Sequence, residues 1–247
     1  MNKINETGHA MNVANLFKLV TYCEAYGSRY NPSNPNLKIP YLRELGANSK
    51  SLSGIVNELL APYNAAHNER ALAFKPLSPL ATRLLNAIKA STTNRKVDDN
   101  IKTYVRKIKG ERASAKTVVV KVEGVVPTDA PNEQSSSQLD FNNRLNNLDI
   151  LIKQLAFIPQ YAPNEQELQV GSLQNMYNDL SAKNNAAVDV QVKIDNARLN
   201  RNKVMYAPLT GLVDVALDVK TYVKSVFGPT SAEYKQISKL KFSPNKK

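Results

Sequence analysis

The residues of this chain with the clearest capacity for chemistry are basic. The 247 residues include 33 Lys and Arg against 21 Asp and Glu, which gives a formal net charge of +12. The cations gather at two points of the chain, namely Lys102, Arg106, Lys107 and Lys109, and then Lys235, Lys239 and Lys241. On a helix, Lys102, Arg106 and Lys109 would share one face and present a basic stripe to phosphates or to an acidic protein. A solvated helix face is the competing interpretation, because lysine is mostly exposed in any protein.

Other residue types that support catalysis or metal binding are sparse. His9 and His67 are the two histidines, and neither has a Cys or paired carboxylates at ligand spacing, so we expect both to be solvated rather than bound to metal. Cys23 is the single cysteine, and its helical spacing from the preceding leucines predicts a small buried apolar residue, not a reactive thiol. Local Ser/His/Asp, Cys/His, phosphate-loop and HExxH motifs are absent. The sequence therefore predicts a protein that is not an enzyme, with no cofactor and no evident small-molecule substrate.

The elements that would position these residues occur twice in the sequence. The run YNPSNPNLKIPYL, which starts at Tyr30, is matched 131 residues later by YAPNEQELQVGSL, which starts at Tyr161, and Arg70 is matched by Arg201 at the same offset. After one inserted residue, FKPLSPL is matched by YAPLTGL and VRKIK by ISKLK. This ordered series indicates a tandem duplication. Because a catalytic constellation normally occurs once, we expect the repeated tyrosines and arginines to have structural roles.

Apolar residues recur mostly at helical spacing, and the nine glycines are few for an all-β protein of this length. We therefore expect an all-α protein made of two tandem helical-bundle repeats of about four helices each. The predicted organisation is a first helical repeat over 1–110, a linker over 111–142, and a second helical repeat with a basic C-terminal tail over 143–247. These ranges carry net charges of +9, −2 and +5.

Local signals predict several details of the helices. Ser78, followed by a proline, and Thr210 are expected to be N-caps of equivalent helices. Pro62 is expected to kink or interrupt its helix. The run DVQVKID, 189–195, alternates like a strand, but we expect a helix because its counterpart in the first repeat does not alternate. Four leucines are predicted to be buried: Leu59, Leu84, Leu151 and Leu217.

The linker divides into two parts by composition. Its first part, around 117–126, is rich in valine, so a strand or hairpin arm and a plain extended connector are both compatible with it. Its second part, PTDAPNEQSSSQ, has the composition of a linker.

No apolar run approaches the roughly 20 residues that a transmembrane helix needs, and the first residues have no apolar signal core, so we expect a cytoplasmic protein. The predicted function is a non-enzymatic helical scaffold or interaction protein that self-assembles or binds an acidic partner. One alternative is a nonspecific nucleic-acid-binding protein that uses the basic repeat ends, although recognition motifs and tryptophan are absent. The other is a helical membrane-active protein in which segment 117–126 inserts into the bilayer.

Overall fold

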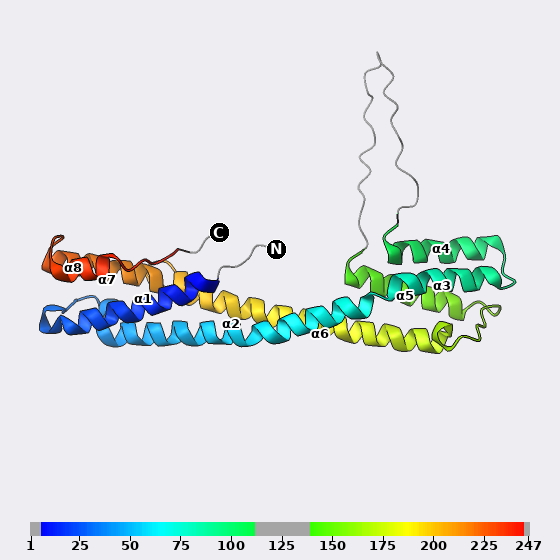
Figure 1. The fold of residues 1–247 in the computed structure, drawn as a ribbon, viewed down its shortest axis with the longest axis horizontal. Helices are drawn as coiled ribbons and strands as arrows, with labels where there is room; N and C mark the ends of the chain where they lie inside the picture. Colours follow the sequence, from blue (N-terminus) through cyan, green and yellow to red (C-terminus); the bar gives the residue numbers. More distant parts are fainter. Residues whose placement is uncertain (1–5, 112–138, 245–247) are drawn as a thin grey trace, which may run out of the picture. The chain divides into compact units, whose positions relative to one another are not determined.

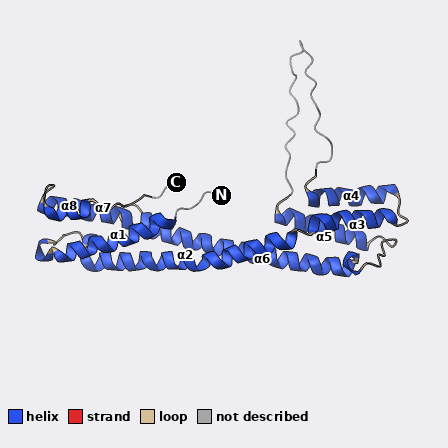
Figure 2. Ribbon diagram, viewed as in Figure 1, coloured by secondary structure: helices blue, strands red, loops and turns tan. Residues whose placement is uncertain are grey.

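The structure of the chain, a computed structural model, describes residues 6–111 and 139–244, and within these ranges every regular element is a helix (Figures 1 and 2). The prediction of an all-α protein is thus confirmed. The valine-rich segment 117–126 and most of the predicted linker lie outside the described residues.

On each side of residues 112–138, four α-helices follow one another, with a 3₁₀ turn directly before the long second helix. The first series is α1 (Glu6–Ala25), the 3₁₀ turns η1 (Gly27–Arg29) and η2 (Pro35–Leu37), α2 (Ile39–Phe74), α3 (Leu77–Ala90) and α4 (Arg95–Lys109). The second series is α5 (Phe141–Ala156), η3 (Gln166–Leu168), α6 (Val170–Tyr206), α7 (Leu212–Phe227) and α8 (Ala232–Ser238). Each series contains one helix of more than 35 residues, α2 with 36 and α6 with 37.

The helices form two compact units. Unit 1 consists of Met1–Asn64 with Asp189–Lys247, and unit 2 consists of Ala65–Val188. In unit 1, α1 packs against α7 and α8, and α7 also contacts η2. In unit 2, α3 and α5 both pack against α4. The helices α2 and α6 each contribute to both units, so each unit combines residues from the range 1–110 with residues from 143–247.

The helices α1 and α5 bury side chains at the same six relative positions. In α1 these are Val13, Asn15, Leu16, Leu19, Val20 and Cys23. In α5, 132 residues later, they are Leu145, Asn147, Leu148, Leu151, Ile152 and Leu155. The spacing places all six on one face of a helix. Burial of Cys23, which is 1% exposed, is confirmed, and burial raises the pKa of its thiol to about 12.

The helices α3 and α7 share a second burial pattern. The buried positions of α3 are Leu77, Leu80, Ala81, Leu84 and Ile88. In α7, Leu212, Val215, Ala216, Val219 and Val223 are buried at the same spacing, 135 residues later. The offset is larger here than in α1 and α5 because two residues connect α2 to α3 whereas five connect α6 to α7.

The predicted N-caps, Ser78 and Thr210, are both wrong. Ser78 lies inside α3, which begins one residue earlier after Pro76, whose φ of −69° already suits a helix. Thr210 precedes α7, whose N-cap is Gly211. A Cβ atom on Gly211 would lie 2.6 Å from the backbone nitrogen of Ala207, so a residue with a side chain does not fit where this helix begins.

Other details agree only in part with the expectations. Residues 189–195 are helical, as predicted, within α6. Pro62 does not interrupt α2, which continues unbroken to Phe74 and buries side chains both before and after the proline. Of the four leucines, Leu84 and Leu151 are fully buried and Leu59 is half-buried, whereas Leu217 is 46% exposed. Leu217 follows the buried Ala216 and so points past the edge of the apolar face.

Candidate functional site

The predicted basic residues lie in two groups, one in each unit. Lys102, Arg106, Lys107 and Lys109 are on α4 of unit 2. Lys235 is on α8 of unit 1, Lys239 is its C-cap residue, and Lys241 lies just beyond. Each group therefore lies within one unit.

The α4 group flanks a buried apolar face formed by Ile101, Val105 and Ile108. Lys102 is exposed, and Arg106 and Lys107 are half-buried. Among the described residues, no ion pair uses any of these three cations, whereas Lys109 Nζ lies 2.6 Å from Glu111 Oε1.

The ends of α4 favour this charge distribution. Asn94 caps the N-terminus by accepting the N–H groups of Lys96 and Val97, and Gly110 closes the C-terminus in the left-handed conformation, with φ of 73°. Cations in the last turn of a helix also interact favourably with its partial negative charge. Arg106, Lys107 and Lys109 therefore have a stabilising role even without a partner, whereas Lys102, nearly two turns from that end, gains little from it.

The three lysines of the α8 group are exposed, and they lie on or just after a shorter helix. Ser231 caps α8 by accepting the N–H of Tyr234, and Ile237 is its buried residue. The side chains of Lys235, Lys239 and Lys241 are in no ion pair among the described residues. The backbone carbonyl of Lys241 accepts a hydrogen bond from Asn15 Nδ2 at 2.7 Å, which holds the segment after α8 against α1.

The two repeated tyrosines anchor equivalent loops. Tyr30 Oη donates to the carbonyl of Leu37 at 2.6 Å, and Tyr161 Oη donates to the carbonyl of Leu168 at 2.7 Å. Burial raises the pKa of both hydroxyls, that of Tyr161 to about 12. Both hydroxyls are therefore protonated donors near neutral pH, and each ties the start of its loop to a 3₁₀ turn.

The repeated arginines lie in different surroundings. Arg70 donates from Nη1 to Asn184 Oδ1 at 3.3 Å and stacks over the Phe141 ring, 4.2 Å from its centroid. Arg201 is 1% exposed in unit 1, and its guanidinium donates to the side-chain oxygen of Asn202.

The expectation of two solvated histidines is wrong for His9. The His9 side chain is buried, and its Nδ1 lies 2.8 Å from the hydroxyl of Tyr206. His67 is half-buried beside Arg70, and burial together with that positive charge lowers the pKa of its imidazole. In the ranges 6–111 and 139–244, no three His, Cys, Asp or Glu side chains cluster as metal ligands would.

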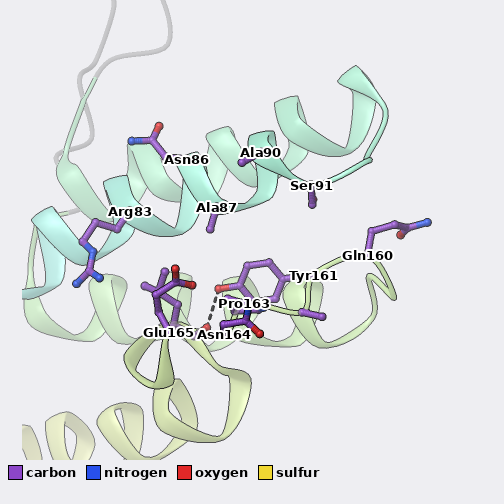
Figure 3. Close-up of a pocket in the computed structure, with 12 residues that line it drawn as sticks. Arg83, Asn86, Ala87, Ala90, Ser91, Gln160, Tyr161, Pro163, Asn164 and Glu165 are labelled. Carbon is purple, nitrogen blue, oxygen red and sulfur yellow. Dashed lines mark hydrogen bonds between the residues drawn. The ribbon is translucent and has the colours of Figure 1, made fainter.

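An open pocket of about 570 Å³ lies in unit 2 between α3 and the loop 160–168 (Figure 3). The α3 side of the pocket is formed by Arg83, Asn86, Ala87, Ala90 and Ser91. On the loop side, the Tyr161 ring lies toward the α3 face that carries Ala87 and Ala90 (Figure 3). Sequence reasoning missed this pocket because alanines on a helix give no signal until the facing loop is known.

The chain matches no protein-family model, no curated protein and no solved structure. Among the described helices, none has a stretch long and apolar enough to cross a membrane.

Proposed function

We propose that this protein is a non-enzymatic helical interaction scaffold, built from a tandem duplication, whose α4 cations bind an acidic partner. One observation supports the binding role above all. Lys102, Arg106 and Lys107 lie close together on α4, the first exposed and the other two half-buried, and no acid of the described residues pairs with them. Lys107 Nζ lies over the Tyr104 ring, 5.5 Å from its centroid, but none of the three cations is neutralised by an acid of the described residues. Neighbouring cations without an acidic partner attract a polyanion more strongly than the same charges spread over the surface.

The duplication is supported by agreement between separate features of the two series. The helix order is the same, both loops carry the same tyrosine-to-carbonyl hydrogen bond, and α1 and α5 bury the same six positions. Among those positions, Asn15 and Asn147 are both buried asparagines. A polar residue is rarely chosen for a helix core, so its recurrence at one offset argues for common origin.

The binding role is tested with a triple variant, Lys102→Glu, Arg106→Glu and Lys107→Glu. Binding of the full chain to poly-glutamate and to single-stranded DNA is measured between 50 and 200 mM salt. We expect wild-type protein to bind poly-glutamate with an affinity that falls steeply with salt, and the triple variant to lose at least tenfold in affinity at the lowest salt.

A matched control variant has the same change in net charge, but its three substitutions lie on different helices. Lys50→Glu, Lys89→Glu and Lys193→Glu alter three exposed lysines on three other helices, and none of these side chains is ion-paired within the described residues. The control should retain most of the binding. If both triple variants lost affinity for poly-glutamate equally, the loss would be explained by net charge alone, and a local binding site on α4 would be refuted. Tight binding to DNA with none to poly-glutamate would favour the nucleic-acid alternative instead.

The duplication is tested by exchanging the two anchored loops. Residues 30–37, YNPSNPNL, are replaced by the sequence of 161–168, YAPNEQEL, in the full chain. If the two loops are structural equivalents, the chimera keeps its helical content by circular dichroism and melts within a few degrees of wild type. Loss of folding would show that the shared tyrosine bond does not reflect a shared loop structure.

A further inference from the structure

The pocket of unit 2 has a counterpart in unit 1 that is already filled. In unit 1, Tyr222 of α7 lies against the anchored loop. Its ring meets that of Tyr30 edge to face, with centroids 5.4 Å apart and an interplanar angle of 89°. Its hydroxyl accepts a hydrogen bond from the backbone N–H of Asn31 at 3.2 Å. The loop of unit 1 is thus covered by a phenol ring held by one aromatic contact and one hydrogen bond.

The corresponding position of α3 carries a methyl group. The burial pattern that α3 shares with α7 at an offset of 135 pairs Ile88 with Val223, and so pairs Ala87 with Tyr222. Ala87 lines the pocket and lies on the α3 face toward Tyr161 (Figure 3). Where unit 1 has a tyrosine ring, unit 2 therefore has an open space.

The loop side of the pocket retains both groups that hold the ring in unit 1. Tyr161 occupies the place of Tyr30, with the same hydrogen bond to a carbonyl seven residues ahead. The residue after it, Ala162, matches Asn31, and no hydrogen bond of the described residues uses the Ala162 N–H. Tyr161 is 8% exposed, so a small part of its side chain is accessible from the pocket, beside this backbone donor.

We infer that the unit 2 pocket binds a phenol ring, placed as Tyr222 is placed in unit 1, on Tyr161 and on the N–H of Ala162. The volume of about 570 Å³ is in the usual range for ligand sites and exceeds what one ring fills. The polar side chains of Arg83, Gln160 and Asn164 line the remaining space. The ligand is therefore a phenol carried on a larger polar molecule. Its source is a small phenolic compound or the tyrosine side chain of a partner peptide.

The first test uses p-cresol, which has the atoms of a tyrosine side chain, and toluene, which lacks the hydroxyl. Each is titrated into the isotope-labelled full chain, and backbone amide shifts are followed by NMR. We expect p-cresol to shift the Ala162 amide saturably, with a dissociation constant on the order of a millimolar for so small a ligand. Toluene should bind at least fivefold more weakly, because it cannot accept the amide hydrogen bond. Equal binding of toluene, or no saturable shift at Ala162, would overturn the inference.

Two variants test the inference by adding the tyrosine ring to unit 2 or by removing it from unit 1. Ala87→Tyr supplies the missing ring and should abolish p-cresol binding to unit 2. Tyr222→Ala removes the ring from unit 1 and should create a new p-cresol site, seen as a shift at Asn31 and a rise in melting temperature on adding p-cresol. The second variant keeps the inference falsifiable if the first does not fold. Persistent binding in a folded Ala87→Tyr protein, or no rescue of Tyr222→Ala, would contradict it.

A final comparison distinguishes the two sources of the phenol. N-acetyl-tyrosinamide and a Gly-Gly-Tyr-Gly-Gly peptide are titrated alongside p-cresol. Tighter binding of the peptide than of p-cresol supports a partner's tyrosine. Weaker binding of both amides supports a small phenolic compound. The site is independent of the α4 cations, so failure here leaves the proposed acidic partner untouched, and the reverse also holds.

Discussion

Replacement of Tyr161 by Phe tests how strongly the anchored loop contributes to the stability of unit 2. The variant keeps the ring and its packing and removes a single oxygen atom. That oxygen donates to the carbonyl of Leu168 at 2.7 Å, and Leu168 is 5% exposed, so water has little access to replace the lost donor. An unsatisfied buried carbonyl costs about 1–3 kcal/mol, and we expect the free energy of unfolding to fall by that amount.

The measurement is equilibrium urea denaturation followed by far-UV circular dichroism. The midpoint should decrease while the slope stays at its wild-type value, because the surface exposed on unfolding does not change. Tyr30→Phe in unit 1 removes the equivalent bond, at 2.6 Å, to a similarly buried leucine, together with the hydrogen bond between the same hydroxyl and Cys23. It should therefore lower the free energy of unfolding by at least as much.

Tyr104→Phe is the matched control. Tyr104 is half-buried on α4, and its hydroxyl makes no hydrogen bond within the described residues, so its loss should change stability by less than about 0.5 kcal/mol. If Tyr161→Phe were as stable as this control, the loop would not depend on its tyrosine, and the structural role that we assign to the repeated tyrosines would be wrong.

Three further results are expected. Leu151→Ala should lower the free energy of unfolding, measured in urea, by about 2–5 kcal/mol because Leu151 is fully buried. Leu217→Ala, at an exposed position, should lower it by less than about 0.5 kcal/mol, and equal losses would contradict the assigned buried faces of α5 and α7. Cys23 is buried, and the pKa of its thiol is raised from 9.0 to about 12. At pH 8 the folded chain should therefore react with a thiol reagent about a thousandfold more slowly than the chain unfolded in urea, and rapid labelling of the folded protein would refute that burial. The pKa of Tyr161 is raised from 10.0 to about 12, so on raising the pH the unfolded state loses the hydroxyl proton first. The contribution of this hydroxyl to stability is present below pH 10 and disappears between pH 10 and 12. In that window the free energy of unfolding of Tyr161→Phe should therefore depend less on pH than that of wild type.

The sequence predicted the helices well because their apolar spacing is regular. The helical assignment of residues 189–195 depended on comparing the two predicted repeats, since the alternation of valines taken alone favours a strand. The buried polar residues were not predictable in the same way. Asn15 is buried because the segment after α8 places a backbone carbonyl beside it, 226 residues further along the chain. His9 is buried for a comparable reason, its contact with Tyr206.

Of the two candidate sites, only the basic group on α4 could be predicted from the sequence. Lys102, Arg106 and Lys109 could be grouped from the sequence because a single helix carries them, and helix geometry alone fixes their relation. The pocket at Ala87 and Tyr161 could not, because it depends on a helix and a loop that are 74 residues apart in the chain. Its clearest sequence signal is the difference between Ala87 and Tyr222, which becomes visible only at an offset of 135 and not at the 131 or 132 found elsewhere.

The sequence also did not predict which helices would combine into one unit, and the reason is the similarity of α3 and α7. Because α3 and α7 bury side chains at the same spacing, each offers α1 the same kind of apolar face. Local pattern therefore cannot decide between them. The contacts of the folded chain decide: α1 packs on α7 and α8 within unit 1, whereas α3 packs on α4 within unit 2. The two sequence ranges that meet in unit 1 are separated along the chain by all the residues of unit 2, so no local pattern within either range reveals their pairing.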